Sequence, residues 1–181
     1  MLYHFSEEPD IARFEPRAPI ARPEVEPMVW AIDQWHAPMY YVPRDCPRAC
    51  FWCGPDTADE DRRWMGNGGA RMVIAIESVW LERVRAAVLY RYRMPPETFV
   101  LGDEEGGHWV SRAPVVPLAI EPMRDLLADL AGAEVELRIM PSLIALWQRV
   151  VGSTLCFSGT RLRNARGWDP ALFERVPRRR I

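Results

Sequence analysis

The side chains best suited to chemistry are concentrated in residues 29–54. This segment holds a histidine, two adjacent tyrosines and three cysteines at Cys-x3-Cys-x2-Cys spacing: His36, Tyr40, Tyr41, Cys46, Cys50 and Cys53. Thiolates and imidazole are ligands for zinc or an iron-sulfur cluster. Tyrosine and histidine rings can instead form the wall of a small-molecule site. The segment therefore supports two hypotheses, a metal site and a ligand-binding wall.

The cysteine spacing resembles the loop with which radical S-adenosylmethionine enzymes hold a cubane cluster, with three thiolates and one open iron. A structural zinc site is the second alternative, with His36 or Cys156 as the fourth ligand. In the third alternative the cysteines are small apolar residues of a strand that reads Ala-Cys-Phe-Trp-Cys. We adopt the third interpretation and keep metal binding as the alternative.

The composition is that of an ordinary globular protein, with 181 residues, 49% hydrophobic residues and a net charge of -2. This charge does not indicate binding to nucleic acid or to an anionic membrane. The first residues do not resemble a secretory signal, and no apolar run approaches the roughly 18 residues that span a bilayer. We therefore expect a cytoplasmic protein. All 23 basic residues are arginine, which excludes lysine-based Schiff-base chemistry.

The order of the predicted elements favours an α+β fold. The residue patterns predict strands at 2–6, 28–32, 89–94, 108–112 and 134–140, and helices at 73–88, 123–131 and 142–151. Because the strands alternate between apolar and polar residues, we expect a largely antiparallel or mixed sheet with about three helices packed on it. In this prediction Glu77 lies on the first helix and forms a salt bridge.

The length predicts a single domain over residues 1–181. Four prolines predict an irregular loop at residues 16–27. The basic tail at 175–181 is expected to fray.

Several segments resemble the opening of the ADP-ribosyltransferase fold. They are Tyr3-His4-Phe5-Ser6, Phe14-Glu15-Pro16-Arg17, Val29-Trp30-Ala31-Ile32-Asp33 and the Tyr40-Tyr41 pair. Residues 90–100 and 108–115 resemble the later strands of that fold. The resemblance implies NAD as a ligand, with His4 and Ser6 on the ribose and Tyr40 or Tyr41 on the nicotinamide. The catalytic glutamate of that family has no direct counterpart, because the matching strand begins at His108. Glu105 or His108 would take the polarising role.

A nucleotide or another phosphate-bearing small molecule is therefore the ligand that we expect, with Arg44 or Arg112 on the phosphate, since guanidinium groups match phosphate oxygens. More widely, six arginines could converge on such a ligand: Arg44, Arg48, Arg71, Arg112, Arg161 and Arg163. Two other functions stay open, namely a zinc or iron-sulfur protein and an interaction module without a ligand.

Over nearly its full length the chain also resembles an uncharacterised bacterial family known only as a domain of unknown function. The similar segments are Leu-Tyr-His-Phe-Ser, Val-Trp-Ala-Ile-Asp, Pro-Arg-Asp-Cys-Pro-Arg, Trp-Val-Ser-Arg and Phe157-Ser158-Gly159-Thr160-Arg161-Leu162-Arg163. This resemblance implies no activity.

Overall fold

The computed structural model describes residues 1–18 and 24–171, and in it the chain forms two compact units. Among the described residues, unit 1 comprises Met1–Tyr41 and Val88–Arg124, whereas unit 2 comprises Val42–Ala87 and residues 125–171. Each unit is thus assembled from two separate stretches, and each is described by itself. The expected single domain stays a prediction. Of the expected proline-rich loop, residues 19–23 lie outside the described residues, as does the whole tail at 175–181.

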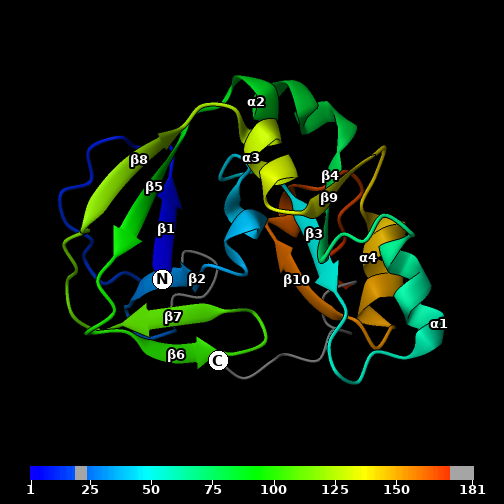
Figure 1. Ribbon diagram of the computed structural model, residues 1–181, viewed down its shortest axis with the longest axis horizontal. Helices are drawn as coiled ribbons and strands as arrows, with labels where there is room; N and C mark the ends of the chain where they lie inside the picture. Colours follow the sequence, from blue (N-terminus) through cyan, green and yellow to red (C-terminus); the bar gives the residue numbers. More distant parts are fainter. Residues whose placement is uncertain (19–23, 172–181) are drawn as a thin grey trace. The chain divides into compact units, whose positions relative to one another are not determined.

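Unit 1 is built on a six-stranded sheet in which every neighbouring pair is antiparallel, in the order β6-β7-β2-β1-β5-β8 (Figure 1). Its elements are β1 (Leu2–Ser6), β2 (Val29–Asp33), the 3-10 helix η1 (Ala37–Tyr40), β5 (Leu89–Met94), β6 (Val100–Asp103), β7 (His108–Ser111) and β8 (Ala119–Met123). The central strand β1 connects β2 on one side with β5 on the other.

One face of this sheet forms a core because its strands alternate apolar and polar residues. In β5, Tyr92 and Met94 are buried, whereas Arg93 between them is exposed. The buried ring of Tyr92 packs edge-on against Phe14. Its hydroxyl donates to the carbonyl of Glu8 and accepts from the Ile11 amide, so the chain after β1 is held over the core.

Unit 2 contains a four-stranded mixed sheet in the order β10-β3-β4-β9, in which only the β4 and β9 pair is parallel. Its elements are β3 (Arg48–Trp52), α1 (Asp59–Arg62), η2 (Arg63–Met65), β4 (Met72–Glu77), η3 (Ser78–Trp80), α2 (Leu81–Ala86), α3 (Leu126–Gly132), β9 (Val135–Met140), α4 (Ile144–Val151), β10 (Cys156–Thr160) and η4 (Leu162–Asn164). Helix α4 packs Leu146, Trp147 and Val150 against one face of β3 and β4, while α3 lies against β9 and α2.

The predicted α+β class with a largely antiparallel or mixed sheet is confirmed. The predicted helix at 73–88 is wrong in its first half, where Met72–Glu77 forms β4, and correct only for α2. All six residues of β4 are buried. An apolar run that is buried on both faces carries no period-two signal, so periodicity could not separate it from a helix. The helix expected to start near Pro122 begins instead at Leu126, because Pro122 belongs to β8, an edge strand on which proline is tolerated.

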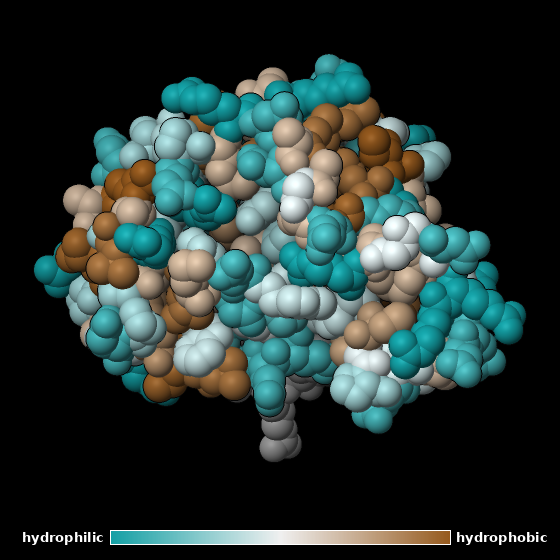
Figure 2. Space-filling model, viewed as in Figure 1, coloured by the Kyte–Doolittle hydropathy of each residue, from teal (hydrophilic) through white to brown (hydrophobic). Residues whose placement is uncertain are grey.

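The surface drawn in Figure 2 is mixed, with hydrophobic patches separated by hydrophilic side chains. The exposed large apolar residues include Val100 and Leu101 on β6 and Ile120 on β8. Within the described residues, no helix combines the length and the apolar character that crossing a bilayer requires.

Candidate functional site

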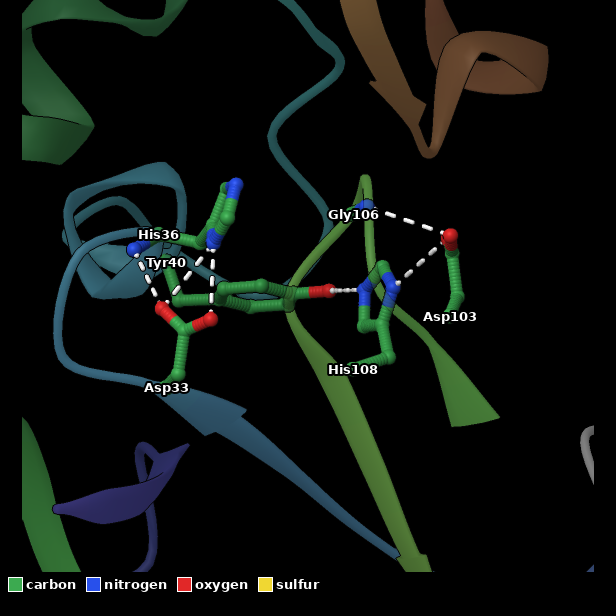
Figure 3. A network of polar contacts seen from close by, with 6 residues as sticks. All are labelled: Asp33, His36, Tyr40, Asp103, Gly106 and His108. Carbon is green, nitrogen blue, oxygen red and sulfur yellow. Dashed lines mark hydrogen bonds and ion pairs between the residues drawn. The ribbon is translucent and has the colours of Figure 1, made fainter. Parts of the chain in front are cut away.

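The most distinctive polar arrangement in unit 1 is a chain of three side chains (Figure 3). The hydroxyl of Tyr40 lies 2.9 Å from Nε2 of His108, and Nδ1 of the same ring lies 3.4 Å from Oδ2 of Asp103. Tyr40 ends η1 and His108 begins β7, so 68 residues of chain separate two groups in direct contact. We call Tyr40, His108 and Asp103 the relay.

The proton positions in the relay follow from donor and acceptor capacity. An ionised carboxylate can only accept hydrogen bonds, so Nδ1 of His108 carries the proton that points at Asp103. In a neutral imidazole Nε2 is then the acceptor, and Tyr40 donates its hydroxyl hydrogen to it. His108 is thus oriented to receive a proton from Tyr40, in the way that a catalytic histidine is held by an aspartate beside a nucleophile.

A β-bulge brings Asp103 opposite His108. Leu101 pairs with Trp109 and Asp103 pairs with His108, so Gly102 is the extra residue on β6. Residues directly opposite each other in an antiparallel pair project on the same face. The bulge therefore places the carboxylate on the same side as the imidazole, a use of bulges that is common near functional sites.

A second histidine and aspartate pair lies at the end of β2. Nδ1 of His36 is 2.9 Å from both carboxylate oxygens of Asp33, and the His36 amide donates to Oδ1 at 2.8 Å. Asp33 therefore closes the turn that leads into η1 and so helps to position Tyr40.

The glycine pair between Glu105 and His108 lies against both histidines. A Cβ on Gly106 would lie 2.7 Å from Nδ1 of His108, and a Cβ on Gly107 would lie 2.1 Å from Nδ1 of His36. Gly107 has a φ of +67°, and its carbonyl accepts from the Asp33 amide at 3.0 Å. The turn can close on both histidine pairs only because neither residue has a side chain.

Asp33 is expected to make the stability of the protein depend on acid pH. Burial alone would raise the pKa of its carboxyl, but the hydrogen bonds from the ring and backbone of His36 outweigh it and hold the pKa below its ordinary value of 3.8. A carboxyl with a lowered pKa stabilises the fold above about pH 4, and this contribution is lost as the pH falls through the folded-state pKa. Asp33→Asn should therefore lower the melting temperature at pH 7, and its difference from the wild type should shrink below about pH 4.

Thermal unfolding between pH 3 and pH 8 measures this effect, with Asp56→Asn as the control on an exposed loop residue. A difference that stays constant over the whole pH range would contradict the role assigned to Asp33.

The other residues predicted for the ligand site are used differently. Nδ1 of His4 bonds to the backbone carbonyl of Trp30 at 2.8 Å, and the buried Ser6 hydroxyl accepts from the Glu8 amide. Tyr41 is buried and packs against Phe5.

Arg112 forms an ion pair with Glu26 at 2.8 Å. Glu105 is exposed on the turn between β6 and β7. Of the predicted site residues in unit 1, the structure joins Tyr40 directly to His108.

The cysteines and Arg44 belong to unit 2. Cys46 and Cys50 are fully buried, and burial raises the pKa of each thiol to about 12. Cys53 packs against the core cluster that contains Ala49 and Phe51, so it lies on the opposite side of β3 from Cys50. The triplet is therefore divided between two faces of one sheet. Across the described residues, no three histidine, cysteine, aspartate or glutamate side chains are grouped so that they could hold a metal ion.

Two residues of the site were not among the predicted site residues. These residues are Asp33 and Asp103. The spacing of Asp33 and His36 is a detectable signal, because three residues within one turn can bring a carboxylate to an imidazole. No comparable local signal exists for Asp103, because its position depends on the bulge at Gly102.

The two sheets and the relay define this molecule as an α+β protein with a candidate acid-base site on its antiparallel sheet. The chain belongs to a family of unknown function, DUF6886, whose model matches residues 3–165. This confirms the predicted membership of an uncharacterised family. Searches of curated proteins and of solved structures found no significant match.

Proposed function

We propose that unit 1 carries out proton transfer on a bound small molecule, with Tyr40 as the group that exchanges the proton. The relay is the observation that carries this proposal. His108 accepts the phenolic proton at Nε2, and Asp103 stabilises the imidazolium that forms. The phenolate oxygen of Tyr40 then acts as a base on the ligand, and the proton returns by the same route.

The surroundings of His108 support a ligand at this place. The indole of Trp30 packs edge-on against the His108 ring, with a centroid separation of 6.2 Å. Within the described residues its buried Nε1 has no hydrogen-bond partner, and a ligand oxygen could supply the missing acceptor. The ring of Tyr40 is parallel to that of Phe5 to within 8°, at a centroid separation of 6.3 Å.

We propose a nucleotide or another phosphate-bearing small molecule related to NAD or ADP-ribose as the ligand. Aromatic rings beside polar groups suit a planar base or a nicotinamide ring. In this proposal His108 replaces Glu105 as the polarising group, because it contacts Tyr40 whereas Glu105 is exposed on the turn. Zinc or iron-sulfur binding is not the function that we favour, because the cysteine triplet is split between two faces of β3.

Tyr40→Phe tests the proposal, since it removes one hydroxyl and keeps the ring. The wild type is screened against NAD, ADP-ribose and common nucleotides by thermal shift for binding and by liquid chromatography for turnover. We expect Tyr40→Phe to reduce the turnover number by about 100-fold or more, because a positioned acid or base contributes about that much, and to leave binding nearly unchanged.

Tyr3→Phe is the matched control, because it removes a hydroxyl that bonds to the Met1 sulfur on an exposed part of the same sheet. The proposal fails if none of these compounds binds or reacts, or if Tyr40→Phe turns over as fast as the wild type.

A further inference from the structure

A pocket of about 450 Å³ opens at one end of the antiparallel sheet of unit 1. It lies where β1 begins and β5 ends, because Leu2 and Met94 pair with each other at these strand ends and both line it. Pro96, Trp109 and Leu118 extend its apolar wall. The lining comes from unit 1 alone. The volume is within the range of small-molecule sites, roughly 300–1,000 Å³.

The pocket is separate from the relay. Trp109 follows His108 directly on β7, so the two side chains project from opposite faces of the sheet. Trp109 packs against the core cluster that contains Leu2 and Met94, whereas His108 contacts Tyr40. A ligand in this pocket would therefore lie on the other face of β7 from the proton-transfer site.

The depth of the pocket is apolar and its mouth is open to water. Leu2 is 6% exposed and Met94 is 2% exposed, so these two side chains form its floor. Leu118 is 59% exposed and lies at the rim. Such a lining favours an apolar group, because filling the pocket removes apolar surface from water.

Arg93 supplies a positive charge at the same pocket, which it also lines. It precedes Met94 and is exposed, so its long side chain can bring the guanidinium over the mouth. In the strand register its neighbours are Tyr3 and Ala119, which carry no negative charge. Across residues 1–18 and 24–171, the Arg93 guanidinium has no hydrogen bond or ion pair.

Arg91 shows how the same strand neutralises an arginine elsewhere. It lies two residues before Arg93 on the same face of β5, and its partner in the register of β8 is Glu121, with which it forms an ion pair. The position opposite Arg93 is Ala119 instead. The charge that β8 supplies for Arg91 is thus missing at the pocket.

We propose that this pocket binds a small carboxylic acid with an apolar body. The body fills the space over Leu2, Met94 and Trp109, and the carboxylate pairs with the guanidinium of Arg93 at the mouth. Burial of the apolar body supplies most of the affinity. The planar guanidinium matches the two oxygens of a carboxylate, so it selects this anion over an uncharged ligand of the same shape. The site is independent of the function proposed for Tyr40.

Calorimetric titration of the full chain with sodium octanoate tests this site, at constant ionic strength and below the concentration at which octanoate forms micelles. We expect saturable binding of octanoate. 1-Octanol has the same chain without the charge and should bind about fivefold more weakly, as the loss of an exposed ion pair predicts. Butyrate keeps the charge on a shorter chain and should bind more weakly by about tenfold or more.

Two variants at exposed positions separate the two contributions, and neither alters the buried floor of the pocket. Arg93→Gln should weaken octanoate binding about fivefold and leave 1-octanol binding unchanged. Leu118→Gln should weaken the binding of both ligands by about the same factor, because it replaces an apolar rim with a polar one. Arg13→Gln is the matched control, since Arg13 is an exposed arginine of unit 1 that pairs with Glu15. This control and Tyr40→Phe should both bind octanoate as the wild type does.

The proposal is overturned if octanoate shows no saturable binding, if 1-octanol binds as tightly as octanoate, or if either variant binds octanoate as tightly as the wild type. Size-exclusion chromatography tests a different occupant. A dimer that octanoate dissociates would show that a second copy of the chain covers the pocket, and this result would also overturn the proposal.

Discussion

Gly107→Ala is expected to destabilise the protein by roughly 3 kcal/mol or more and to disrupt the Asp33 and His36 pair. The added Cβ would lie 2.1 Å from Nδ1 of His36 and 2.6 Å from Oδ2 of Asp33, so both side chains must move. A left-handed alanine costs about 1–2 kcal/mol by itself. The loss of hydrogen bonds to a charged carboxylate adds about 1.5–3 kcal/mol.

Gly69→Ala is a matched control, because Gly69 has a φ of +71° and no atom lies within 4 Å of the position of its Cβ. It carries only the conformational cost, so it should lose about 1–2 kcal/mol. Urea denaturation gives both free energies of unfolding. The chain has three histidines, so nitrogen-detected NMR of the imidazoles can follow His36 and His108 separately. If both variants lost the same free energy of unfolding and the imidazole spectra were unchanged, Gly107 would not pack closely against the ring of His36.

Glu77→Ala is expected to cost about 3–5 kcal/mol. Glu77 is 1% exposed and ends β4, where its carboxylate accepts from the amides of Leu143 and Arg166. Leu143 is the N-cap residue of α4, so a negative charge there also complements the positive end of the helix dipole. Alanine would leave two amide donors without this acceptor, at about 1–3 kcal/mol each, and would open a cavity.

Glu77→Gln keeps an oxygen acceptor and most of the volume, so it should cost less than half as much as Glu77→Ala. Glu82→Ala is the surface control, since Glu82 lies on α2 in an exposed ion pair with Arg85, and it should change the free energy of unfolding by no more than about 0.5 kcal/mol. Urea denaturation compares the three variants. A small loss for Glu77→Ala, similar to that of Glu82→Ala, would refute the role of Glu77 as the link between β4 and α4.

Glu77 also shows why the apolar periodicity of residues 73–88 led to a wrong helix prediction. It was expected on a helix and in a salt bridge, but it closes a buried strand and binds backbone amides instead. β4 lies between β3 and β9, which come from parts of the chain far apart in sequence. The local sequence pattern does not reveal that distant segments will cover both faces of an apolar segment. Pairing with β3 and β9 in the folded chain therefore determines that Met72–Glu77 is a strand.

The sequence alone was sufficient for the features that depend on local chemistry. The alternation in Leu89–Met94 predicted β5, because period two is a property of the strand itself. The α+β class and the membership of an uncharacterised family also followed from the sequence, and Tyr40 and His108 were both named as candidate residues. What these two residues do together did not follow. Their contact needs the turn held by Asp33 and the antiparallel pairing of β2 with β7, and the bulge at Gly102 then brings Asp103 to the same histidine. Only the folded chain combines these three conditions.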